Sequence, residues 1–226
     1  MRKIEISGLI EEGMWNYGDS LTGKEKEVFA GPRIREMATV EKDGYSAHRM
    51  DFSILTGTYL ETPAHLISGA YTVDKIPLEN LFLEATILKI SKNPGECILL
   101  EEIKTKKWKI KEGGALIIFT GYFRKWNTKD FFLNSPYFTA EAMDYIVSKK
   151  IKILAADLPC YDNARNPEDL ENLPQLTKLY NHNIMALAPI VNGDKVEEGY
   201  GELIVLPLKV KGWSASPARA VLIIGG

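Results

Sequence analysis

Hydrophobic residues recur along this chain in short runs that are rich in Val, Ile and Leu. Where both alternating sets of positions in a run are apolar, the pattern is typical of strands buried on both faces of a sheet. The runs predicted to be strands are residues 4–10, 85–90, 115–120, 151–156, 203–210 and 220–224. They indicate a core built around a β-sheet.

Two segments predict helices instead. Within residues 140–150 an apolar stripe runs at helical spacing from Ala142 to Val147, and Thr139 can cap the first turn. This helix leads straight into the strand at 151–156, an α-then-β order typical of a mixed α/β domain. A second helix is predicted over residues 173–185.

Two polar stretches, residues 13–35 and 163–174, predict long loops. Loops carried by a rigid scaffold often form the rims of binding sites. Both stretches are therefore candidate rims of a pocket.

Composition and charge narrow the class of protein. The chain has 226 residues, of which 45% are hydrophobic and 26% charged, as expected for one globular domain spanning residues 1–226. The net charge is -2, and the Lys and Arg residues are scattered, which argues against nucleic-acid binding. A small-molecule substrate is the expected partner.

The cysteine content and the apolar runs indicate a cytoplasmic protein that does not enter a membrane. Cys97 and Cys160 are too few for a disulfide framework or a four-thiolate zinc site. The first ten residues alternate apolar and charged side chains instead of forming a signal-peptide core, and no later run approaches membrane-spanning length.

The segment at residues 55–65, LTGTYLETPAH, combines many polar groups with apolar flanks. In an extended chain Leu55, Tyr59 and Glu61 face the same side, so Tyr59 and Glu61 can converge on a ligand, and His65 follows the bend at Pro63. The alternative is a turn punctuated by Gly and Pro whose His and Glu are surface residues.

This segment resembles the motif His-x-Gly-Thr-His-x-Asp-x-Pro-x-His of the cyclase/kynurenine-formamidase family, without a gap. The identical positions are Gly57, Thr58, Pro63 and His65. Leu55 and Tyr59 stand at histidine positions, and Glu61 stands at the aspartate. Further segments resemble the family in the same order, namely residues 113–122, 135–150, 157–162, 206–209 and 216–220, and more weakly 13–19.

The resemblance implies a swivelling β/β/α fold, an α/β single domain around a mixed β-sheet, assembled as a homodimer or larger homo-oligomer. It also implies an arylformamidase-like hydrolase of C–N bonds in small amides, or of lactones, with a place in tryptophan catabolism. Family members hold a divalent metal, zinc or manganese, through the first two motif histidines, the aspartate, and a later His and Glu.

The substitutions remove most of this expected metal site. Leu55 has no donor, Tyr59 binds metal only as a phenolate, and Glu61 alone keeps a donor. The later pair falls on Tyr180 and Asn192 in the favoured register, or on His182 and Asp194 in a register shifted by two. We therefore assign no metal ligand, although a relocated metal on Glu61, His65 and His182 stays an alternative.

The predicted catalytic residues are His65 as general acid/base, Glu61 as base or metal ligand, and Tyr59 as a hydrogen-bond donor to a developing oxyanion. Asp157 and Asp162 either orient His65 or cap a loop. The alternatives to a hydrolase are a metal-free lyase or cyclase and a non-catalytic protein that binds a small metabolite.

The predicted substrate-binding residues are Trp15, Tyr122, Cys160 and His182. The aromatic rings of this chain can line a pocket for a flat substrate, or they are ordinary core residues, and the rings considered are Trp15, Tyr17, Tyr122, Phe123 and Trp126. Cys160 is either a nucleophile or a buried structural thiol, and His182 either contributes to the site or lies on a helix surface.

Overall fold

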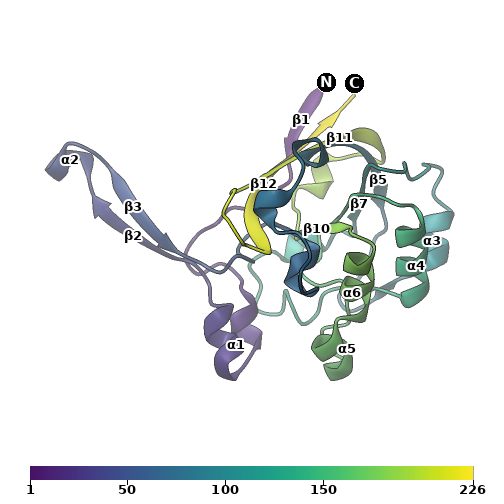
Figure 1. Cartoon of the computed structure of the whole chain (residues 1–226), viewed down its shortest axis with the longest axis horizontal. Coiled ribbons are helices and arrows are strands. Elements are labelled where there is room, and N and C mark those ends of the chain that lie inside the picture. Colours follow the sequence, from purple (N-terminus) through teal and green to yellow (C-terminus); the bar gives the residue numbers. More distant parts are fainter. Residues whose placement is uncertain (226) are drawn as a thin grey trace.

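The computed structural model describes residues 1–225 and has a mixed eight-stranded sheet at its centre (Figure 1). The sheet closes on itself because β4 pairs with both β10 and β12, while β1 joins β12 outside the ring. Its strands are β1 (Arg2–Glu5), β4 (Tyr59–Glu61), β5 (Phe82–Lys89), β7 (Ala115–Phe119), β9 (Ile153–Ala156), β10 (Met185–Ala188), β11 (Gly199–Pro207) and β12 (Ala215–Ile224).

Strands β5, β7, β9 and β10 are parallel neighbours, and the other pairings of the sheet are antiparallel. Alternate side chains of β7 enter two separate cores. Ile117 and Phe119 fill the inside of the ring, whereas Leu116 and Ile118 pack on the helix-covered outer face. The predicted mixed α/β fold and its strands buried on both faces are therefore confirmed.

Helices α3 (Leu100–Lys104), α4 (Ala140–Ser148) and α6 (Pro174–Asn181) lie side by side over the parallel strands (Figure 1). The predicted cap of α4 is present, since the Thr139 hydroxyl accepts a hydrogen bond from the Ala142 amide at 3.3 Å. The other helices are α1 (Gly23–Val28), α2 (Val40–Asp43) and α5 (Pro167–Asn172). The 3₁₀ turns are η1 (Tyr17–Ser20), η2 (Pro63–His65), η3 (Val73–Lys75), η4 (Leu78–Leu81), η5 (Tyr122–Lys125) and η6 (Gly193–Lys195).

The second predicted helix, residues 173–185, is shorter than expected, and the assignment of its last four residues, 182–185, was wrong. Helix α6 ends at Asn181, Asn183 takes a left-handed conformation with φ of 56°, and the chain then enters β10. Asn tolerates this conformation better than most residues. The apolar residues after it complete the parallel sheet beside β9 instead of extending the helix.

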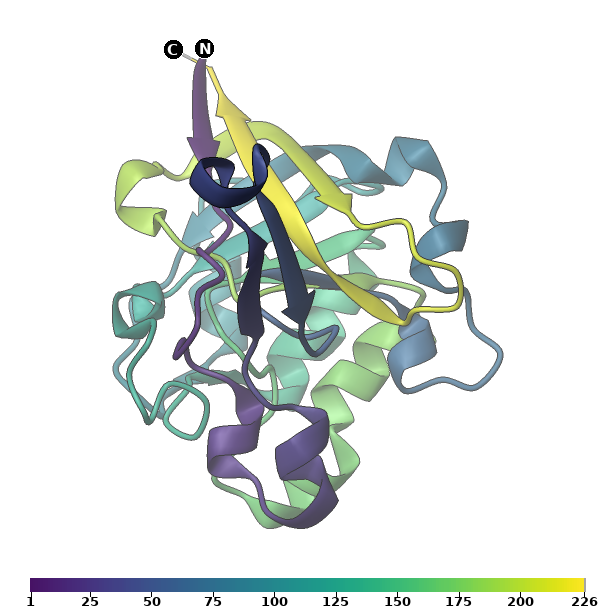
Figure 2. The same cartoon turned by 90° about the vertical axis from the view of Figure 1, so that its left-hand side faces the viewer.

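A hairpin of β2 (Arg33–Ala38) and β3 (Ala47–Asp51), with α2 at its tip, projects away from the sheet (Figures 1 and 2). The remaining pairing joins β6 (Cys97–Ile98) to β8 (Tyr137–Phe138). Both termini lie at the same end of the molecule because β1 pairs with β12 (Figure 2). Across residues 1–225, none of the helices has the length and apolar character needed to cross a membrane.

Candidate functional site

Strand β4, which carries Tyr59 and Glu61 of the 55–65 segment, lies between β10 and β12. The Thr58 hydroxyl donates to the Pro189 carbonyl oxygen at 2.5 Å and accepts from the Gly8 amide at 2.9 Å, which holds the entry to β4. Within β4, Tyr59 lies opposite Ala188 and Glu61 lies opposite Ala186. Side chains at paired positions share a face, so these four residues point to the same side of the sheet.

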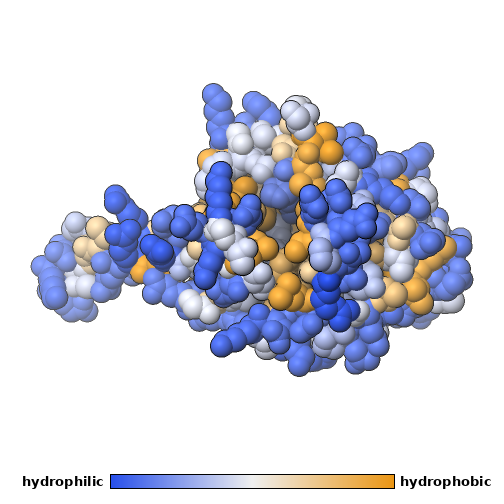
Figure 3. Space-filling view, turned by 90° about the horizontal axis from the view of Figure 1, so that it is seen from below, coloured by the Kyte–Doolittle hydropathy of each residue, from blue (hydrophilic) through white to orange (hydrophobic). Residues whose placement is uncertain are grey.

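Tyr59 and Glu61 line a cavity of about 230 Å³ together with Leu55 and His65. The opposite walls come from residues 13–35 and 163–174, the two stretches predicted to be loops that rim a pocket. Each stretch contains a short helix, α1 in the first and α5 in the second. The lining side chains from these segments and from α6 are mainly apolar: Leu21, Glu25, Phe29, Leu170, Leu173 and Leu176. The space-filling view from below shows apolar residues gathered around a hollow on this face (Figure 3).

Two tyrosines form a directed hydrogen-bond chain at the cavity wall. The Tyr17 hydroxyl lies 2.6 Å from the Tyr59 hydroxyl and 2.5 Å from the Pro159 carbonyl oxygen. A carbonyl only accepts, so Tyr17 donates to Pro159 and Tyr59 donates to Tyr17. Burial raises the pKa of both phenols well above the ordinary value, which keeps them protonated. Tyr59 therefore presents an oxygen lone pair to the cavity instead of the predicted donor.

Glu61 and His65 form the only close acid–base contact found among the cavity-lining side chains of residues 1–225. His65 Nε2 lies 3.1 Å from Glu61 Oε1, and His65 Nδ1 lies 3.4 Å from the Ser214 hydroxyl. Glu61 is only 4% exposed, and its Oε1 accepts no hydrogen bond of normal geometry. Burial raises the pKa of the Glu61 carboxyl, and the nearby His65 and Tyr180 partly oppose that rise.

Neither predicted register brings the later pair of metal ligands into the cavity. His182 is exposed at the end of α6, where its Nδ1 lies 2.9 Å from the Lys178 carbonyl oxygen. Asn192 donates to the Glu5 carbonyl oxygen, on another part of the surface. The relocated metal site that included His182 is therefore not assembled.

Two other residues with the same twelve-residue separation do line the cavity. They are Leu176 on α6 and Ala188 on β10, and neither carries a donor atom. Leu55 is also apolar and Tyr59 is a protonated phenol, so the carboxylates that line the cavity within residues 1–225 are Glu61 on β4 and Glu25 at the rim on α1.

The resulting donor set does not fit a zinc or manganese ion. Such ions need several nitrogen or carboxylate donors that converge on one point. Nowhere in residues 1–225 do three or more His, Cys, Asp or Glu side chains come together in a way that could hold a metal ion. The chemistry of this cavity therefore has to be sought in Glu61, His65 and Tyr59.

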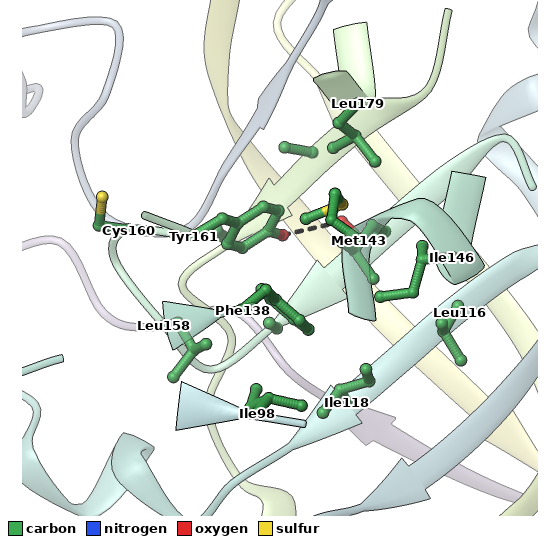
Figure 4. Close-up of a cluster of buried hydrophobic side chains, with 14 of the residues drawn as sticks. Ile98, Leu116, Ile118, Phe138, Met143, Ile146, Leu158, Cys160, Tyr161 and Leu179 are labelled. Carbon is green, nitrogen blue, oxygen red and sulfur yellow. Dashed lines mark hydrogen bonds between the residues drawn. The ribbon is translucent and has the colours of Figure 1, made fainter. Parts of the chain in front are cut away.

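The predicted substrate-binding residues divide into one that lines the cavity and three that do not. Cys160 lines it, and burial raises the pKa of its thiol to about 12, so that it stays a neutral thiol. Its side chain points away from the cluster around Tyr161, whose hydroxyl donates to the Leu154 carbonyl oxygen at 2.9 Å (Figure 4).

Trp15 and Tyr122, like His182, lie elsewhere. Trp15 packs edge-on against Tyr17 in the core, behind the cavity wall. Tyr122 stacks on Phe131 at 5.2 Å between ring centroids, and its hydroxyl donates to the Phe131 carbonyl oxygen at 2.9 Å. The expectation that these residues line the pocket needs correction, because their rings fill the core instead.

Asp157 and Asp162 hold the backbone and do not contact His65. Asp157 accepts from the Thr120 amide and hydroxyl at 2.8 Å and from the Gly121 amide at 2.9 Å, so it organises the turn after β7. Asp162 accepts from the Gln175 and Leu176 amides at the start of α6. Burial raises the pKa of Asp162 to about 6.

Sequence reasoning missed Leu176 and Ala188 as cavity residues, whereas Tyr17 was among the aromatic residues named as able to line a pocket. Leu176 and Ala188 have no polar side chain, so nothing in their chemistry marks them.

Comparisons with known proteins agree with this architecture. The chain is 28% identical over 185 residues to kynurenine formamidase of Bacillus thuringiensis (strain Al Hakam), covering 80% of this chain and 82% of that protein. It is 26% identical over 216 residues to isatin hydrolase of Roseibium aggregatum, covering 84% of this chain and 80% of that protein.

Among solved structures, isatin hydrolase A from Labrenzia aggregata bound to benzyl benzoate superposes with a TM-score of 0.87. The alignment covers 100% of this chain and 94% of that chain at 20% sequence identity, and so supports the fold. Residues 4–163, which are more than half of the 226 residues, match the family described as putative cyclase. The chain therefore belongs to the putative cyclase family.

Proposed function

We propose that this protein hydrolyses a small amide or lactone with a flat apolar body, using Glu61 and His65 for proton transfer without a metal ion. The 3.1 Å contact between His65 Nε2 and Glu61 Oε1 in the cavity wall carries this proposal. A carboxyl whose pKa is raised by burial is better matched to proton transfer near neutral pH than an ordinary glutamate. The relatives named kynurenine formamidase and isatin hydrolase support the same reaction class.

The reaction begins with Glu61 ionised and His65 protonated. Glu61 takes a proton from water as the water oxygen bonds to the substrate carbonyl carbon. The tetrahedral intermediate collapses, the C–N or C–O bond breaks, and His65 gives its proton to the leaving nitrogen or oxygen. Glu61 then returns the proton to His65 across the short contact between them. The Tyr59 oxygen accepts a hydrogen bond from the substrate and so orients it.

The test is hydrolysis of formanilide and of isatin, two neutral amides with a free N–H and a flat ring, by chelator-treated protein whose metal content is measured by elemental analysis. We expect turnover that does not depend on added zinc or manganese. Glu61→Gln and His65→Asn should each lower kcat by about 10²-fold or more. Glu27→Gln, an exposed carboxylate on α1 that does not line the cavity, should leave the rate unchanged. Turnover that strictly requires added metal would refute the proposal.

A second candidate is a non-catalytic protein that binds a small metabolite. It is favoured by the apolar side chains of Leu55, Leu176 and Ala188 in the lining, which offer no metal donor. The Tyr59 proton is also committed to Tyr17, so Tyr59 cannot donate to an oxyanion. Binding without turnover of any amide or lactone in a substrate panel would favour this candidate.

We further propose that the chain assembles as a homodimer or larger homo-oligomer in the cytoplasm. Support comes from the β2–β3 hairpin, which exposes Met37, Val40, Tyr45 and Met50 away from the sheet (Figure 1). A lone two-stranded hairpin is only marginally stable in water, so packing against a second copy would stabilise it. Light scattering coupled to size-exclusion chromatography tests this, and a monomer at micromolar concentration would contradict it.

A further inference from the structure

Two side chains of the cavity, Tyr59 and Glu61, offer a ligand hydrogen-bond acceptors. Tyr59 has donated its proton to Tyr17, so its oxygen can only accept. Glu61 Oε1 is buried in the wall beside His65 Nε2, and a carboxylate oxygen has a second lone pair beyond that contact. Two acceptors therefore face the cavity with capacity to spare.

The potential donors of the lining are already engaged. Both ring nitrogens of His65 face protein atoms, Nε2 facing Glu61 and Nδ1 facing the Ser214 hydroxyl. The Tyr161 proton goes to the Leu154 carbonyl oxygen, and the Tyr17 proton goes to Pro159. The Cys160 thiol is the one side-chain donor in the lining of residues 1–225 without such a partner, and a thiol donates weakly.

The charged side chains of the lining also disfavour an anionic ligand. Glu61 lies in the wall and Glu25 lies on α1 at the rim, while the lining within residues 1–225 contains no Lys or Arg. The one group that can carry positive charge, His65, is paired with Glu61. An anion that entered this apolar space would lose its hydration and find no cation free to compensate.

We infer that the cavity selects a ring-shaped apolar ligand that presents a hydrogen-bond donor, either a neutral N–H or O–H group or an ammonium, and rejects one that carries a carboxylate. The donor bonds to Glu61 Oε1 and the Tyr59 oxygen, and the ring lies against Leu55, Phe29 and Leu176. Under the proposed function, on which this inference rests for its site, the substrate is therefore an amide with a free N–H or a ring-bound amine or hydroxyl, and not a carboxylic acid.

The test compares three probes that share one ring and differ only in the polar group: benzylamine, benzyl alcohol and benzoate. Their binding to the full-length protein at pH 7 is measured by titration calorimetry and by ligand-observed NMR, without any turnover. We expect benzylamine to bind about tenfold or more tightly than benzoate, with benzyl alcohol between them. Glu61→Gln should reduce the difference between benzylamine and benzoate to about threefold or less, and Glu27→Gln should leave it unchanged.

Benzoate binding as tightly as benzylamine, or no binding of any probe, would overturn the inference. So would an unchanged order in Glu61→Gln, because Glu61 would then play no part in selection. The outcome is separable from the hydrolysis assay. Selective binding without turnover leaves this inference standing and refutes the hydrolase, whereas turnover with a preference for anions does the reverse.

Discussion

Replacing Glu61 by methionine should stabilise the fold while abolishing proton transfer in the cavity. Glu61 is 4% exposed and its Oε1 accepts no hydrogen bond of normal geometry. A buried polar group left unsatisfied costs about 1–3 kcal/mol, and methionine has a similar length without that penalty. The lost contact with the partly exposed His65 offsets up to about 1 kcal/mol. A net gain of about 1–2 kcal/mol, in the middle of the range these terms allow, corresponds to a Tm rise of about 2–8 °C for a domain of this size.

The pH dependence gives this prediction a second readout. Burial raises the pKa of Glu61 in the folded chain above its unfolded value of about 4.3. The folded state therefore binds more protons between these two pKa values, and the stability of the natural chain falls as pH rises through that window. Below the unfolded pKa both states are protonated, so the charge contributes nothing there. The advantage of Glu61→Met should be largest above the folded pKa and should shrink as pH falls towards about 4.

Circular dichroism melts of both proteins at one concentration, from about pH 4 to about pH 8, measure this difference. Glu27→Met is the matched control, because Glu27 is exposed on α1, and its Tm should change by less than about 2 °C. A Glu61→Met protein that is less stable at neutral pH would show that the carboxylate makes favourable interactions in the cavity. An advantage that grows as pH falls would show that the assigned direction of the pKa shift is wrong.

Three further predictions concern the cavity and the turn after β7. The double variant Leu55→His, Tyr59→His should create, with Glu61, a three-donor zinc site. Titration calorimetry should detect one zinc ion per chain in this variant and none in the natural chain. Lack of zinc binding by the double variant would contradict the positions assigned to these side chains. Tyr17→Phe removes both hydrogen bonds of its hydroxyl and should lower the free energy of unfolding by about 1–3 kcal/mol in urea titrations, whereas a change below about 0.5 kcal/mol would show that the chain from Tyr59 is not formed. Asp157→Asn replaces a carboxylate that accepts from backbone amides by a side-chain amide, one end of which cannot accept. It should lower the free energy of unfolding by about 2–3 kcal/mol in urea titrations, and an unchanged midpoint would contradict this.

The sequence alone was sufficient for the local features of the fold. Strands such as β7 and β9 were predicted because continuous apolar runs bury both faces, and α4 because its stripe and its Thr139 cap lie within a few residues of one another. The side shared by Tyr59 and Glu61 followed from the alternation of an extended chain, whereas Leu55 reaches the same cavity from a turn that precedes β4. The resemblance of scattered motifs to the cyclase family added the fold class, which the comparisons confirm.

Only the tertiary structure decided which distant residues face that segment. The register of β10 against β4 places Ala188 opposite Tyr59, and Asp162 fixes the start of α6 so that Leu176 reaches the cavity. Sequence spacing cannot distinguish Leu176 and Ala188 from the equally spaced pair at Tyr180 and Asn192. The pairing of strands and the docking of a helix are set by contacts between residues far apart in the chain. Hydrophobic periodicity, in contrast, reports only on a residue's near neighbours, so the composition of the cavity had to come from the folded molecule.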